Sequence, residues 1–321
     1  MPKLSVVVPM HNVGAFAESA LRSLAKNADP DFEFLLVDDC SKDSTPWVID
    51  RWADKLPHTR VIRHERNMGI AQARNSGIDA ANGDYLTFLD GDDWYGPGHL
   101  SAMVDAIEEL GCDFARTDHV QATGTDRVIR RAPARMRDRV MDPRDGIMPV
   151  HTETMVDYPF VWAGIYSRHL FEDGGMRFAT ELRTAEDRLW IWRLHLKAES
   201  YASLGLNGIF YRRGVATSLT QVKDDRQLDF IAAYDTLIQD LLQDRDGDRF
   251  LLKAVRTYCA MIAFHLAKVD AYEPAAAKRL RHDARAALHR MPEHALEETL
   301  RTIDHTRGKL LSRLRDGRKA A

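Results

Sequence analysis

The chain has 321 residues, of which 45% are hydrophobic and 29% charged, and its formal net charge is −3. This length suggests two domains, or one large domain with an appendage. The chain can bury a large core, which excludes a disordered tail, a fibrous repeat and a disulfide scaffold. The slightly acidic balance excludes a polycation built for nucleic acid, so no nucleic-acid partner is expected.

The compartment is predicted from the cysteines and from the apolar runs. The three cysteines are scattered and form no CxxC pair, which is typical of a reducing compartment. The apolar run near the N-terminus is too short for a signal peptide, and no stretch approaches 18 apolar residues. We therefore expect a cytoplasmic protein, and any membrane contact would be peripheral, at the inner face.

The first 115 residues alternate between β-branched runs and segments with apolar residues at helical spacing. Strands are predicted over 4–8, 32–37, 60–64, 85–89 and 113–117. Helices are predicted over 15–26, 45–55 (capped by Ser44), 70–81 and 99–110. This alternation indicates an α/β fold with a mostly parallel, Rossmann-like sheet covered on both faces.

After residue 116 the pattern weakens and then becomes helical. Six arginines crowd around Pro133 in an irregular excursion or hairpin: Arg127, Arg130, Arg131, Arg135, Arg137 and Arg139. A strand over 161–167, a helix over 186–196 and a strand over 209–212 follow. Four helices are then predicted, over 228–243, 249–269, 275–290 and 294–314. The predicted domains are 1–220, with a donor half 1–118 and an acceptor half 119–220, and a helical C-terminal region 225–321.

Polar residues recur where the predicted strands end, and the acidic turn Asp90–Asp93 is the most informative of them. In an open α/β sheet, ligands bind at this edge. Crowded carboxylates repel unless a cation neutralises them, and Mg²⁺ uses one or two carboxylates together with substrate phosphates. The turn therefore fits a metal–diphosphate site, although the bare pattern by itself is more typical of a solvated acidic turn.

Four segments in order make the pattern specific: SVVVPMHN (5–12), LVDDCSKDST (36–45), NMGIAQARNSG (67–77) and GDYLTFLDGDDW (83–94). This set resembles the family 2 glycosyltransferases (GT2), which have a GT-A fold and a DXD motif. The resemblance is close over 3–118 and looser over 158–220. It implies an inverting hexosyl- or N-acetylhexosaminyltransferase that uses a nucleotide-sugar, usually a UDP-sugar, with Mn²⁺ or Mg²⁺ as cofactor.

The resemblance also implies roles by position. Asp92 would hold the metal, and the donor would be bound by Pro9, His11, Asn12, Asp38, Asp39, Asn67, Arg74, Asp90 and Gly91. A flat ring at His11 can stack on a base, and Asp39 can accept from the imide N–H of uracil. Arg74 can pair with phosphate oxygens, and the metal would neutralise the leaving diphosphate. His11 replaces the family's usual Tyr or Phe, and Cys40 stands where Gly or Asn is common.

An inverting transfer needs a base to take the proton of the acceptor hydroxyl. The segment TAEDRLW (184–190) resembles the family's Glu-Asp pair, so Asp187 is the predicted base and Glu186 its support. Acidic residues also favour helix N-termini for purely electrostatic reasons. The Gln-x-x-Arg-Trp motif of processive synthases does not match, which favours a non-processive enzyme.

The acceptor is expected to be a glycan or an anionic glycopolymer, such as one of the cell wall polysaccharides. Trp162 and Trp190 could pack against sugar rings, and Arg212 or Ser218 could lie in a loop over the diphosphate. Each also fits an ordinary core or loop role. The arginine-rich span is either a solvated hairpin or a groove for an anionic polymer, whose attraction salt would weaken.

Alternatives remain open at this stage. The basic C-terminal helix fits homo-oligomer formation or contact with a membrane surface. A catalytically inactive nucleotide-sugar-binding module would keep the same fold. A nucleotidyltransferase would also join an α/β sheet to bound metal, but it usually carries a Gly-rich phosphate loop after the first strand.

Overall fold

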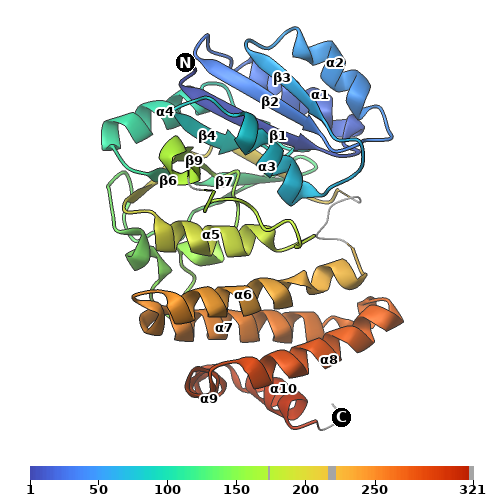
Figure 1. The fold of residues 1–321 in the computed structure, drawn as a ribbon, viewed down its shortest axis with the longest axis vertical. Coiled ribbons are helices and arrows are strands. Elements are labelled where there is room, and N and C mark those ends of the chain that lie inside the picture. Colours follow the sequence, from blue (N-terminus) through green and yellow to red (C-terminus); the bar gives the residue numbers. More distant parts are fainter. Residues whose placement is uncertain (173, 216–221, 318–321) are drawn as a thin grey trace. The chain divides into compact units, whose positions relative to one another are not determined.

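The computed structural model describes residues 1–172, 174–215 and 222–317 (Figure 1). They form two compact units. The first contains residues 1–146, 155–181 and 193–215, and the second contains 147–154, 182–192 and the residues from 216 onward. The segments 147–154 and 182–192 thus belong to the second unit, although they lie before residue 220, the predicted end of the first domain. The predicted boundaries stay a prediction.

The first unit is built on a seven-stranded sheet in the order β10-β6-β9-β4-β1-β2-β3. Its strands are β1 (Leu4–Met10), β2 (Phe32–Asp38), β3 (Thr59–Arg63), β4 (Tyr85–Phe88), β6 (Phe114–Thr117), β9 (Gly164–Ser167) and β10 (Tyr201–Leu204). Strand β9 is antiparallel to β4 and β6, and the other pairs are parallel. The predicted mostly parallel sheet is therefore confirmed.

The helices that accompany this sheet are α1 (Gly14–Ala25), α2 (Thr45–Ala53), α3 (Ile70–Ala80), α4 (His99–Leu110) and α5 (Glu186–Lys197), of which α5 begins in the second unit. Strands β1 and β2 are buried along their whole length. A Cβ on Gly77 of α3 would lie 2.2 Å from a methyl carbon of Val7, so this glycine lets α3 approach β1. Ser44 does not cap α2 with its side chain; Asp43 accepts the Thr45 N–H instead.

A second, four-stranded sheet in the same unit was not predicted. Its order is β5-β11-β7-β8, with β5 (Trp94–Tyr95), β7 (His119–Thr123), β8 (Asp126–Arg130) and β11 (Ile209–Arg212). Strands β7 and β8 form an antiparallel hairpin that includes Arg127 and Arg130, whereas the rest of the arginine-rich span, to Arg139, is irregular. Both forms expected for this span therefore occur. All five residues of β8 are exposed. Short 3-10 helices occupy 143–147, 155–157, 168–171, 225–228 and 269–271.

The second unit is helical, as predicted. It contains α6 (Asp229–Gln243), α7 (Gly247–Leu266), α8 (Pro274–Arg290), α9 (Glu293–Thr302) and α10 (His305–Arg315). The single helix expected over 294–314 is wrong, because Asp304 accepts the Arg307 N–H and starts a new helix. The apolar residues Ile303 and Leu311 are buried inside this unit.

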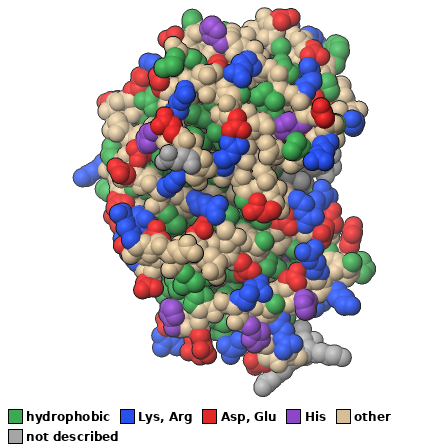
Figure 2. Space-filling view, in the orientation of Figure 1, with side chains coloured by type: hydrophobic (Ala, Val, Ile, Leu, Met, Phe, Trp, Pro, Cys, Tyr) green, Lys and Arg blue, Asp and Glu red, His purple; other side chains and the backbone are tan. Residues whose placement is uncertain are grey.

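The helices and the surface charges can be compared with what a membrane span or an anion-binding face requires. Across the part of the chain that the structure describes, every helix is too short or too polar to cross a membrane. Figure 2 shows basic and acidic side chains interspersed over the face in view. Binding of an anion would therefore depend on local groups rather than on the net charge.

Candidate active site

The acidic turn follows β4, and residues from β11 and α3 contact it. Asp93 is fully buried, and its Oδ1 accepts the backbone N–H of Arg212 at 2.7 Å. Its Oδ2 has no hydrogen-bond partner among the described residues. The Asp92 carboxylate is half-buried, and among the described residues no side chain donates a hydrogen bond to it. The turn thus holds two carboxylates, those of Asp92 and Asp93, that no described side chain pairs.

Electrostatics favour a cation at this turn. Burial, together with the nearby charge of Asp90, raises the pKa of Asp92 to about 6. Burial also raises the pKa of Asp93 well above its usual range, with Asp92 and Asp90 adding to the effect. A bound divalent ion would supply the missing positive charge and reverse these shifts.

The metal implied by the sequence resemblance fits the residues present. Within residues 1–172, 174–215 and 222–317, no three His, Cys, Asp or Glu side chains form a cluster that could hold a metal ion. A site built on Asp92 alone would have to complete its coordination with water and ligand oxygens. Mg²⁺ commonly binds in that manner beside phosphates.

Arg74 of α3 reaches the same turn. Its guanidinium lies 3.0 Å from Oδ1 of Asp90 and 5.2 Å above the Phe178 ring. The side chain is only 5% exposed, which keeps the cation in one place. Gly91 has a packing role, because a Cβ there would lie 2.9 Å from a Met10 side-chain carbon.

At the end of β1, hydrogen bonds orient the predicted base-stacking ring. Asn12 accepts the Lys42 N–H with Oδ1 and therefore donates from Nδ2 to Nε2 of His11. Nδ1 of His11 consequently donates to the carbonyl of Asp39 at 2.7 Å. His11 is exposed, so one ring face is accessible. Pro9 lies buried within β1.

Just after β2, the Asp39 carboxylate accepts most of its hydrogen bonds from groups of the protein. It is 3% exposed and accepts the N–H groups of Met68 and Gly69, each at 2.8 Å. His64, which the sequence analysis did not single out, donates to it at 2.7 Å. A carboxylate offers about four acceptor positions, so one remains for a base. His64 directly follows β3, and a polar residue after a predicted strand was the available signal.

The neighbouring positions complete this edge. Asp38 is buried and accepts the Ser41 N–H. Asn67 is exposed. Cys40 has φ of +59°, a left-handed conformation in which Gly or Asn is less strained, which explains why those residues are common there. The structure therefore brings Asp39 and the acidic turn to one sheet edge, as predicted from the strand ends, and Arg74 of α3 reaches the same turn.

The predicted acceptor-side residues are placed differently. Trp162 and Trp190 are 4% and 1% exposed, so neither presents an open ring face to a sugar. Arg212 bonds to the acidic turn, and Ser218 lies outside the described residues.

In the second unit, the predicted base begins α5. Asp187 is half-buried and accepts the N–H of Arg188, whereas Glu186 is only 6% exposed. Thr184 in the preceding turn donates to the Arg226 carbonyl at 2.6 Å. Of the two carboxylates, Asp187 is the more accessible.

Comparison with known proteins identifies this arrangement. A sequence profile described as glycosyl transferase family 2 matches residues 5–171. The chain belongs to this family. The family 2 assignment made from the four sequence segments is thereby confirmed, and the acidic turn is the DXD motif that the assignment implied.

Two curated relatives are bacterial glycosyltransferases. The chain is 30% identical over 230 residues to the uncharacterized glycosyltransferase EpsJ of Bacillus subtilis. It is 28% identical over 216 residues to the poly(ribitol-phosphate) β-N-acetylglucosaminyltransferase TarS of Staphylococcus aureus. The alignments cover 69% and 66% of this chain, but only 64% of EpsJ and 35% of TarS.

Solved structures confirm the fold of this family 2 glycosyltransferase. TarS residues 1–349 in complex with UDP-GlcNAc match 99% of the chain and 93% of that structure with a TM-score of 0.74 at 20% identity. The mannosyltransferase PcManGT of Pyrobaculum calidifontis, in complex with GDP-Man and Mn²⁺, matches with a TM-score of 0.51 at 17% identity. The GT-A domain followed by a helical region is therefore the architecture of this chain.

Proposed function

We propose that this chain is a metal-dependent, inverting glycosyltransferase that moves a sugar from a UDP-sugar to a hydroxyl of a cell wall glycopolymer. The observation that carries the proposal is the acidic turn, whose Asp92 carboxylate is half-buried beside Asp90 and has a raised pKa. The fixed cation Arg74 and the oriented ring of His11 lie at the same sheet edge.

The donor half of the proposed mechanism uses four residues. His11 stacks on the base, and the last acceptor position of Asp39 takes the imide N–H. Arg74 binds a diphosphate oxygen from a position fixed by Asp90. Asp92 would hold a divalent ion, and that ion, when bound, would supply Lewis-acid neutralisation of the diphosphate.

In the proposed transfer, the acceptor oxygen forms a bond to the anomeric carbon while the bond from that carbon to the diphosphate oxygen breaks. The acceptor proton passes to Asp187, and Glu186 supports the start of the helix. The electron pair of the broken bond leaves with the nucleoside diphosphate. Attack opposite the leaving group inverts the anomeric centre.

The choice of donor and acceptor draws on relatives. A similar structure holds UDP-GlcNAc, and the relative TarS is named for a poly(ribitol-phosphate) acceptor. PcManGT was solved with GDP-Man and Mn²⁺, which supports a metal and makes GDP the rival nucleotide.

Thermal stability with UDP, GDP, CDP and dTDP, each with and without Mn²⁺, tests the proposal. A ligand at 100 times its dissociation constant adds about 2.7 kcal/mol of stability. We expect a shift with UDP that requires Mn²⁺ and that the Asp92→Asn variant loses. UDP-sugar turnover then separates an enzyme from an inactive binding module. No shift with any nucleotide would overturn the proposal.

A further inference from the structure

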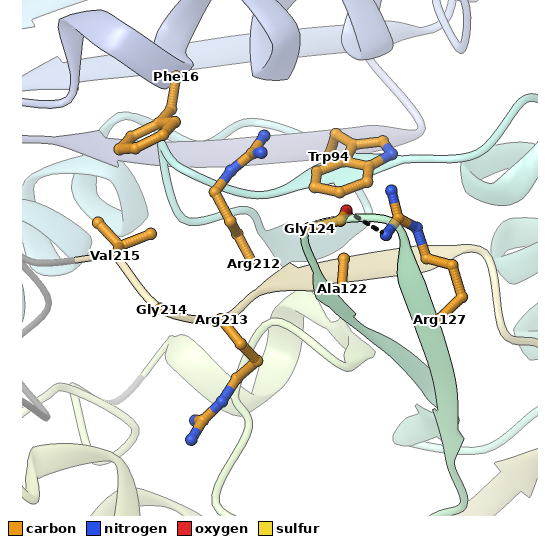
Figure 3. Close-up of a pocket in the computed structure, with 9 residues that line it drawn as sticks. All are labelled: Phe16, Trp94, Ala122, Gly124, Arg127, Arg212, Arg213, Gly214 and Val215. Atoms are coloured by element: carbon orange, nitrogen blue, oxygen red, sulfur yellow. Dashed lines mark hydrogen bonds between the residues drawn. The ribbon is translucent and has the colours of Figure 1, made fainter.

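A small cavity of about 200 Å³ lies beside the second sheet of the first unit (Figure 3). It is lined by Phe16, Trp94, Ala122, Gly124, Arg127, Arg212, Arg213, Gly214 and Val215. Of the arginines crowded around Pro133 in the sequence, Arg127 reaches this cavity, whereas Arg137 pairs with Asp118. Of the six clustered arginines, Arg127 is therefore the candidate for a specific binding role at this cavity.

Two guanidinium groups are held in place at this cavity without a carboxylate partner. Arg127 donates to the carbonyl oxygens of Gly124 at 2.8 Å and Asp126 at 2.7 Å. Arg212 donates to the Asp92 carbonyl at 2.9 Å and to Ser19 Oγ at 3.1 Å. Among the described residues, neither guanidinium forms an ion pair, although the charge of Arg212 acts at longer range on the carboxylates of Asp92 and Asp93. Both cations thus keep N–H groups free for an anion.

Aromatic rings form the wall between these cations. The Trp94 ring stacks on Phe210, with centroids 5.2 Å apart and planes 7° apart. Arg212 lies 4.6 Å from the centroid of Trp94 and 4.9 Å from that of Phe16, and Arg127 lies 5.7 Å from that of Trp94. Figure 3 shows the Arg127 and Arg212 guanidinium groups near Trp94, while Arg213 points away. An apolar ring face beside fixed guanidinium groups matches a phosphorylated polyol or sugar.

The cavity is attached to the DXD turn through Arg212, because this side chain bonds to the Asp92 carbonyl. A donor diphosphate is expected on the Asp92 carboxylate. Asp92 does not line the cavity, so an anion bound between Arg127 and Trp94 would be a different group from that diphosphate.

We propose that this cavity is an acceptor subsite that binds a phosphodiester group of the acceptor chain, with Arg127 as its specific cation and Trp94 as its apolar wall. The proposal rests on the proposed function and names the part of the acceptor that this chain recognises. Salt weakens the attraction, since Arg127 is exposed.

Direct binding tests the subsite without turnover. Titration calorimetry at low salt would use a ribitol phosphate oligomer, neutral ribitol and inorganic phosphate as probes. The variant is Arg127→Gln, and Arg130→Gln is the matched control, because both arginines are exposed on β8 while Arg130 does not line the cavity. We expect the wild type and Arg130→Gln to bind the oligomer, Arg127→Gln to bind it at least tenfold more weakly, and ribitol not to bind.

Other outcomes would overturn the subsite. Equal losses in the two variants would mean non-specific attraction by the arginine-rich hairpin. Inorganic phosphate binding as tightly as the oligomer would mean a free-phosphate site, and no oligomer binding by the wild type would mean no acceptor site. UDP with Mn²⁺ is titrated in parallel: a loss in Arg127→Gln would assign the cavity to the donor. Arg127-dependent oligomer binding without UDP binding would overturn the proposed function and leave the subsite standing.

Discussion

The guanidinium of Arg74 lies 3.0 Å from the carboxylate of Asp90, so α3 and the DXD turn share an ion pair that is mostly shielded from water. Removing one partner of such a pair leaves the other charge uncompensated. We expect Arg74→Gln to lower the free energy of unfolding by about 2–4 kcal/mol and to weaken UDP binding. Urea unfolding and calorimetry with UDP and Mn²⁺ measure the two effects. Arg74→Lys keeps the charge and should recover part of the stability, whereas an unchanged unfolding midpoint in Arg74→Gln would contradict the prediction.

The charge of Asp92 should make metal binding depend on pH. Burial and Asp90 raise its pKa to about 6, and only the ionised carboxylate binds a cation well. We expect the Mn²⁺-dependent stabilisation by UDP to be weak at about pH 5 and complete at about pH 7.5. Thermal unfolding across this range measures it. Asp92→Asn should abolish the metal effect at every pH, and a metal effect independent of pH would count against Asp92 as the ligand.

The raised pKa of Asp92 also predicts that its ionised carboxylate destabilises the metal-free protein. Because the folded-state pKa lies above the ordinary value, the folded chain binds this proton more tightly than the unfolded chain. Stability from Asp92 is therefore present below about pH 4 and is lost as the pH rises through about 6. We expect Asp92→Asn to be more stable than the wild type by about 1–3 kcal/mol at neutral pH without metal. Urea unfolding in the presence of a chelator would show whether this gain exists.

Asp39 and His64 allow the structural and ligand-binding roles of the β2 end to be separated. His64→Ala removes one internal partner of the carboxylate and should cost about 1–3 kcal/mol of stability while leaving UDP affinity nearly unchanged. Asp39→Asn should weaken UDP binding in addition, because the charged acceptor is lost. Calorimetry and urea unfolding of both variants measure the split. Equal UDP affinity in the two variants would remove Asp39 from the proposed base contacts.

The parallel sheet and its polar edge were predictable because their signals are local. Strands such as β1 and β2 are short apolar runs that His11 and Asp39 directly follow, and parallel strands bring such ends together. The family segments then gave the order of the site residues. The local pattern did not predict that Asp39 accepts the N–H groups of Met68 and Gly69, because these residues lie in a loop about 30 residues later in the chain.

The second sheet was missed for physical reasons. Strand β8 is exposed on both faces, so it has no alternation of apolar and polar residues to detect. Strand β5 has only two residues and pairs with β11, more than 100 residues later in the chain. The single helix predicted over 294–314 was wrong because Ile303 continues the apolar spacing across the break between two helices. The only local signal of that break is Asp304, which caps the second helix. Long-range pairing and capping geometry therefore set the limit of the sequence analysis.

The division of work between Asp187 and Glu186 gives the most direct test of catalysis. Asp187 is half-buried at the start of α5, whereas Glu186 is 6% exposed, so the first can reach an acceptor proton more readily. General-base catalysis contributes about 10²–10⁴-fold in rate. We expect Asp187→Asn to lower kcat by that factor while UDP and Mn²⁺ still bind with wild-type affinity, and Glu186→Gln to lower stability with a smaller loss of kcat. Steady-state kinetics with a UDP-sugar and binding calorimetry on the same preparations measure both. An Asp187→Asn enzyme with wild-type kcat would assign the proton to another base, and one that also lost UDP affinity would place Asp187 in donor binding instead.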